Sequence, residues 1–133
     1  YYGLRKETEH IELIIEWMKN HFDLQNEFRG LKEKKYDIPL YRALWAIMFS
    51  RSCYCDMLKN IPIDIAEKEL VQENLQGLFE SWRELRGALV KAYYQNKKQI
   101  DEDLYQLVTG ILSKEKETME CNIDMLRTMK RLI

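Results

Sequence analysis

The sequence predicts an all-α fold: a four-helix up-down-up-down antiparallel bundle, with a bent or extra short helical segment after the first helix. Two observations lead to this prediction. Apolar residues recur at helical spacing along most of the 133-residue chain, and only five Gly and two Pro interrupt it. So few turn-forming residues favour long helices over many short strands. The length suits one hydrophobic core, so we expect residues 1–133 to form a single helical-bundle domain.

The first helix is expected to cover about residues 4–22, where an apolar stripe repeats at helical spacing. This stripe consists of Leu4, Ile11, Ile14, Ile15, Met18 and Phe22. Residues 23–35 also contain apolar side chains, but these fall out of phase with the first stripe, and Gly30 interrupts them. This stretch is therefore expected to be a bent extension of the helix or a second short helix.

A second long helix is expected to begin at Asp37 and to end before Pro62. The Asp37 side chain can accept hydrogen bonds from the first turn, and Pro39 is tolerated there because no intrahelical donor is needed yet. The apolar residues wrap much of the circumference, which is typical of a helix packed between neighbours. They are Leu40, Tyr41, Leu44, Trp45, Ile47 and Met48.

The third helix has the clearest predicted start, because Asp64 followed three residues later by Glu67 matches a capping box. The helix is expected to run to about Asn96, with an apolar seam that alternates steps of four and three residues. The seam consists of Val71, Leu75, Leu78, Trp82, Leu85, Leu89 and Ala92. Because the second helix is too short to cover all of it, the fourth helix, residues 23–35 or another chain must cover the rest.

The fourth helix is expected to start at Asp101. Two further acidic residues, Glu102 and Asp103, are favourable at the positive end of the helix dipole, and three basic residues suit its negative end. The basic residues are Arg127, Lys130 and Arg131.

Polar residues fall on the apolar stripes of the second and fourth helices. A projection of about 100° per residue places Arg51 in the middle of one stripe and Glu115 in the middle of the other, with Asn122 two turns further on. An unpaired charge in a core is costly, so two opposite charges at matching depth are expected to meet. The sequence therefore predicts a buried or half-buried salt bridge between Arg51 and Glu115. Further partners are Asn122, Tyr54 or Ser50.

This pair can be interpreted in three ways. A polar pair inside a bundle can select one helix register over alternative registers of nearly equal stability, while adding little to the stability itself. Alternatively, Arg51, Glu115 and Asn122 line a ligand pocket or a switchable core. The third interpretation is that the helical phase is wrong and one group reaches solvent along its stem.

Composition argues against several classes of function. The net charge of −1 gives no general attraction for nucleic acid or an anionic membrane. The longest strongly apolar run, residues 43–49, is far shorter than the roughly 20 residues that span a bilayer. The cysteines, Cys53, Cys55 and Cys121, are odd in number, so free thiols in a reducing compartment, the cytoplasm, are expected.

The motifs do not predict catalysis. The sequence contains no Gly-rich phosphate loop, no Gly-x-Ser-x-Gly and no His-Glu-x-x-His. Glu7 and His10 have the Glu-x-x-His spacing of metal-binding bundles, but the third helix supplies only apolar residues to its seam. We therefore expect no metal and no cofactor, and we favour a protein that is not an enzyme.

The function that remains is a non-enzymatic helical scaffold or regulatory module that binds a protein partner, or a second copy of itself, through an aromatic-rich helix face. Aromatic residues are enriched at protein interfaces, and Trp17, Tyr93 and Tyr94 are the candidates. Because Tyr93 and Tyr94 are adjacent, they diverge by about 100° and one is expected to be exposed. The alternatives are a small-ligand or metal-binding bundle that uses the interior polar residues, and a nucleic-acid-binding bundle.

Overall fold

The computed structural model describes residues 12–14, 16–33 and 38–133. Within these ranges all regular secondary structure is helical, which confirms the predicted all-α class. Residues 12–14 and 16–21 are helical and form the described part of the N-terminal segment. The later elements are α2 (Leu24–Glu27), the 3-10 helix η1 (Leu31–Glu33), α3 (Pro39–Lys59), α4 (Ala66–Tyr94) and α5 (Glu102–Leu132).

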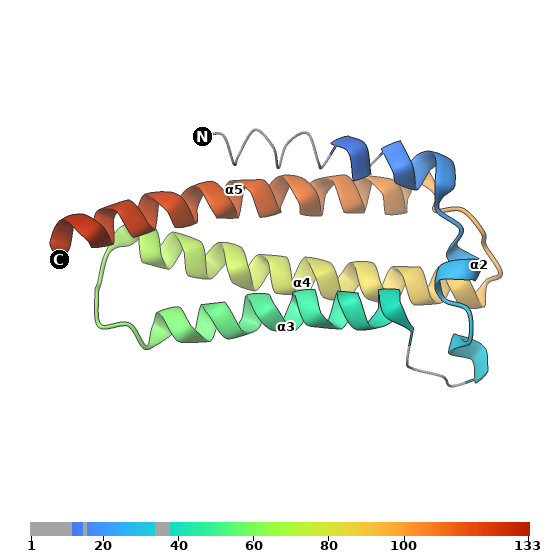
Figure 1. Cartoon of the computed structure of the whole chain (residues 1–133), viewed down its shortest axis with the longest axis horizontal. Helices are drawn as coiled ribbons and strands as arrows, with labels where there is room; N and C mark the ends of the chain where they lie inside the picture. The colour runs from blue at the N-terminus through green and yellow to red at the C-terminus, as the bar shows by residue number, and fades with distance from the viewer. Residues whose placement is uncertain (1–11, 15, 34–37) are drawn as a thin grey trace.

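The three long helices run side by side and antiparallel, and α4 packs against both α3 and α5 (Figure 1). Residues 60–65 and 95–101 form the turns between them. The N-terminal segment lies along the first part of α5 (Figure 1), where Lys19 Nζ is 4.6 Å from the centre of the Tyr105 ring. None of the helices in the described part of the chain is long and apolar enough to cross a membrane.

The short segment after the first helix covers the end of α4. The backbone N–H of Leu24 donates to the carbonyl of Lys98 at 2.7 Å, which ties α2 to the turn after α4. The side chain of Phe28 is fully buried, and its ring centre lies 6.0 Å from that of Tyr93. This segment therefore packs on the part of α4 that lies beyond the start of α3.

The apolar interior is divided into two clusters along the helices. The larger cluster, which includes Met48 and Leu78, extends to the end where α2 packs on α4. The smaller cluster lies toward the turn between α3 and α4. It contains Cys55, Leu58, Val71, Leu75, Met125 and Met129. All seven residues of the predicted α4 seam are buried, which confirms that seam.

Two predicted helix starts differ from the structure. The N-cap of α3 is Ile38, with Pro39 in the first turn, in place of the predicted Asp37, which lies outside the described residues. The N-cap of α4 is Ile65, which has extended backbone and makes no side-chain cap. The predicted capping box of Asp64 with Glu67 was therefore wrong.

Burial of apolar side chains explains where α4 begins. Ile61, Ile63 and Ile65 all pack against the smaller cluster, and Lys68 Nζ donates to the carbonyl of Ile61 at 2.6 Å. A capping side chain stabilises a helix by about 1 kcal/mol, which three partly buried isoleucines together exceed. The apolar contacts therefore decide the path of the turn, and Asp64 lies one residue before the cap position.

The end of α4 also differs slightly from the prediction. The helix ends at Tyr94 instead of about Asn96, because Asn96 has the left-handed φ of 62°. This conformation lets the N–H of Lys97 donate to the carbonyl of Ala92 at 3.1 Å. The hydrogen bond gives a partner to one of the carbonyl groups in the last turn of the helix.

The predicted start of α5 is confirmed. Asp101 is the N-cap, and its carboxylate accepts a hydrogen bond from the N–H of Leu104 at 2.9 Å. The Nζ of Lys97 lies 3.5 Å from the other carboxylate oxygen. The Leu104 hydrogen bond, and then the charge of Lys97, lower the pKa of Asp101 below its ordinary value of 3.8.

Removing the Asp101 carboxylate is expected to destabilise the protein. Because the pKa is lower in the folded state, this contribution is present above pH 3.8 and is lost as the pH falls through the folded-state pKa. Thermal melts followed by circular dichroism should show a lower melting temperature for Asp101→Ala at neutral pH, and a smaller loss for Asp101→Asn, which can still cap. A loss for Asp101→Ala that persists undiminished far below pH 3.8 would contradict this assignment.

Candidate functional site

Arg51 of α3 and Glu115 of α5 meet in a bidentate ion pair. Arg51 Nε donates to Glu115 Oε1 and Arg51 Nη2 donates to Glu115 Oε2, each at 2.9 Å. The two side chains are 28% and 21% exposed, so the pair is half-buried. This is the contact that the helical projection predicts, and it links α3 to α5 directly.

The Glu115 carboxylate has a third donor that the sequence analysis missed. The indole N–H of Trp82 in α4 donates to Glu115 Oε1 at 2.7 Å, so all three long helices meet at this carboxylate. Trp82 was counted only as an apolar seam residue. The sequence indicates this second role only through a general rule, which is that a buried indole N–H usually requires a hydrogen-bond acceptor. Ser50 also takes part, since its hydroxyl accepts from Arg51 Nη1 at 3.1 Å.

The hydrogen bond of Asn122 is to Tyr54 and not to the ion pair, although the sequence analysis named Asn122 as a further partner. Its Oδ1 accepts from the Tyr54 hydroxyl at 2.6 Å, which gives α3 and α5 a second polar link. The buried Asn74 of α4 also escaped the sequence analysis. Its side-chain amide donates to Cys121 Sγ at 3.7 Å, a weak contact between α4 and α5.

On α3 and α5 these residues lie between the two apolar clusters, whereas on α4 Trp82 belongs to the larger cluster and Asn74 lies between Val71 and Leu75 of the smaller one. On α3, Arg51 and Tyr54 lie between Met48 of the larger cluster and Leu58 of the smaller one. On α5, the polar residues lie likewise between one member of each cluster, Ile111 and Met125. The polar layer is defined here as Arg51, Tyr54, Asn74, Trp82, Glu115, Cys121 and Asn122.

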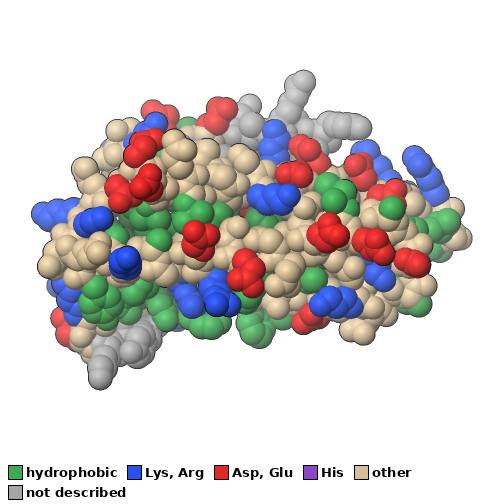
Figure 2. All heavy atoms as spheres, turned by 180° about the vertical axis from the view of Figure 1, so that it is seen from behind, with side chains coloured by type: hydrophobic (Ala, Val, Ile, Leu, Met, Phe, Trp, Pro, Cys, Tyr) green, Lys and Arg blue, Asp and Glu red, His purple; other side chains and the backbone are tan. Residues whose placement is uncertain are grey.

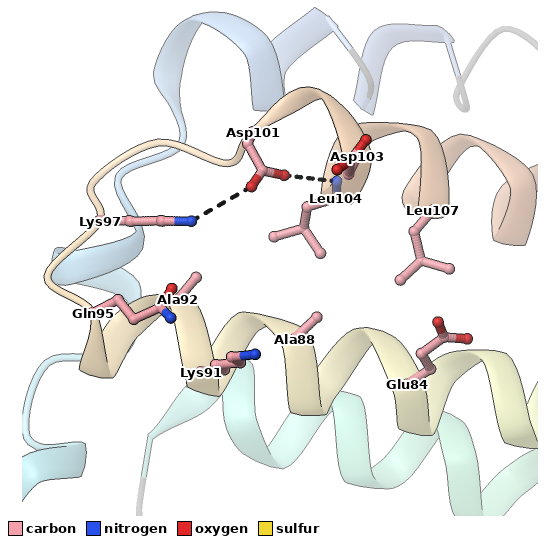
Figure 3. A pocket seen from close by; sticks show the side chains of 10 residues that line it. All are labelled: Glu84, Ala88, Lys91, Ala92, Gln95, Lys97, Asp101, Asp103, Leu104 and Leu107. Atoms are coloured by element: carbon pink, nitrogen blue, oxygen red, sulfur yellow. Dashed lines mark hydrogen bonds and ion pairs between the residues drawn. The ribbon is translucent and has the colours of Figure 1, made fainter.

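A cavity of about 420 Å³ lies elsewhere, between the end of α4 and the start of α5 (Figure 3). Its floor consists of short and branched apolar side chains, and its rim is charged. The residues drawn in Figure 3 are Glu84, Ala88, Lys91, Ala92, Gln95, Lys97, Asp101, Asp103, Leu104 and Leu107. No member of the polar layer lines this cavity, so the interior ion pair does not contact a ligand bound there.

Metal ligands do not gather in the part of the chain that the structure describes, where no group of three or more His, Cys, Asp or Glu side chains could hold a metal ion. The sequence candidates Glu7 and His10 lie outside the described residues. The cysteines are free, with Cys53 exposed on α3 and Cys55 buried.

The three predicted interface aromatics occupy different environments. Tyr93 is buried, while Tyr94 is 52% exposed, as their divergence on the helix predicts. Trp17 is 46% exposed and makes an edge contact with Phe22, with ring centres 5.9 Å apart. Because Tyr93 lies in the larger cluster, it is not available to a partner.

The outward side of α3 carries a more continuous exposed apolar surface than those three aromatics. Trp45, Phe49 and Met57 are 44%, 63% and 50% exposed, and Cys53 between them is also exposed. Trp45 departs from the expectation that the apolar residues around this helix pack between neighbouring helices. We call this surface, made of Trp45, Ala46, Phe49, Cys53 and Met57, the α3 outer face.

Comparison with known protein families, with curated proteins and with solved structures finds no match to this chain.

Proposed function

We propose that this chain is a non-enzymatic helical scaffold or regulatory module that binds a protein partner through the α3 outer face. The observation that carries the proposal is the spacing of Trp45, Phe49, Cys53 and Met57 at intervals of four residues. Residues four apart lie on one side of a helix, so these side chains form a single exposed ridge. Figure 2 shows hydrophobic side chains along the lower edge of the molecule, where α3 lies, with basic side chains among them.

The indole ring of Trp45 stacks against the guanidinium group of Arg86 on α4. The guanidinium carbon of Arg86 lies 4.4 Å from the centre of the Trp45 ring and 5.8 Å from that of Tyr41. Arg86 Nη1 is buried and has no hydrogen-bond partner among the described residues, so stacking on the rings is the main interaction of this end of the side chain. A tryptophan fixed in this way loses little conformational freedom on binding, which suits an anchor of a protein interface.

The polar layer supports a structural role for Arg51, Glu115 and Asn122 in the same module. Arg51 bonds Glu115, and Asn122 bonds Tyr54, so a ligand would have to break these contacts before it could use them. A shift of α3 along α5 by one turn, about 5.4 Å, would break both links together. This supports the interpretation that the layer selects one helix register. It does not favour the small-ligand alternative, because Arg51, Glu115 and Asn122 are already bonded to other side chains.

We also propose that the N-terminal segment completes a four-helix up-down-up-down bundle within one domain. Its described residues lie along α5 (Figure 1), and Phe22 at their end belongs to the larger cluster. The exposed free thiol of Cys53 suits a reducing compartment, and we propose the cytoplasm. Acidic and basic side chains are interspersed on the face in Figure 2, which favours a protein partner over a nucleic acid.

Photo-crosslinking tests the proposed function. A benzophenone amino acid in place of Phe49 should give adducts with one defined protein when the full chain is illuminated in cells. Mass spectrometry of the adducts should map them to a single surface of that protein, and excess unlabelled chain should compete with them. The same amino acid in place of Glu120, which is exposed on α5, is the matched control. If adducts at position 49 do not exceed those at position 120, the α3 outer face is not a binding surface.

A further inference from the structure

We draw no further inference here: the strongest candidate, the exposed apolar surface of the α3 outer face around Phe49, carries nothing beyond the proposed function, because nothing in the part of the chain that the structure describes shows what covers it.

Discussion

Leu24→Ala is expected to lower the free energy of unfolding by about 3–5 kcal/mol, which is a large part of the stability of a domain of this size. Leu24 is 0% exposed and lies in the larger apolar cluster, where α2 covers the end of α4. Truncating it removes buried methyl groups and leaves a cavity that the surrounding side chains fill only in part. Urea denaturation followed by circular dichroism measures this loss as a lower midpoint.

The matched control for this prediction is Leu126→Ala. It makes the same chemical change on α5, but Leu126 is 50% exposed, so little apolar surface returns to water. We expect its unfolding free energy to stay within about 0.5 kcal/mol of the parent value. If Leu24→Ala costs no more than Leu126→Ala, then α2 does not hold the end of α4, and the apolar seam there would be open to a partner.

Glu115→Leu is expected to destabilise the protein by about 2–3 kcal/mol. A fully buried pair broken on one side costs about 3–5 kcal/mol, and partial solvation of Arg51 reduces this figure. The substitution leaves the Arg51 guanidinium and the Trp82 indole N–H without their acceptor. Arg51→Met should cost less, because the remaining carboxylate keeps the Trp82 hydrogen bond and its partial access to water.

The double variant Arg51→Met with Glu115→Leu should be less destabilised than the two single losses added together, because no unpaired charge remains. Urea denaturation of the four proteins gives this coupling. The exposed pair of Lys114 and Glu117, 3.4 Å apart on α5, is the control, and removing it should have almost no effect. Harmless single substitutions at Arg51 and Glu115 would show that the polar layer does not hold α3 against α5.

Sequence reasoning correctly predicted the features that follow from burial in the interior, namely the apolar seam of one helix and the pairing of buried charges. The α4 seam was predictable because its steps of four and three residues continue without interruption along the whole helix. Arg51 and Glu115 were predictable as partners because a charge on an apolar stripe must find an opposite charge or reach water. Their third partner, Trp82, was not identified. The apolar periodicity treats tryptophan as a hydrophobic residue and takes no account of its indole N–H.

The errors arose where tertiary contacts outweigh a local signal. The Asp64 and Glu67 pattern is a valid capping box, but the packing of Ile65 moves the cap position by one residue. Trp45 was counted among residues that pack between neighbouring helices, because apolar residues that wrap much of the circumference do not reveal whether the side of α3 that carries Trp45 is covered. That side is exposed, and it carries the candidate interface that the sequence analysis had assigned to Trp17, Tyr93 and Tyr94.

The two apolar clusters of the interior also differ in their content of sulfur-containing side chains. The smaller cluster is rich in sulfur, because Cys55, Met125 and Met129 belong to it and Cys121 packs against it. Thioether side chains adapt to irregular space, but oxidation turns them into polar sulfoxides that a closed apolar interior cannot accommodate. Oxidative damage that reaches the inside during transient opening would therefore fall mainly at the end near the α3–α4 turn, while the larger cluster, which is built largely of leucine and aromatic side chains, offers fewer such targets, Met48 among them.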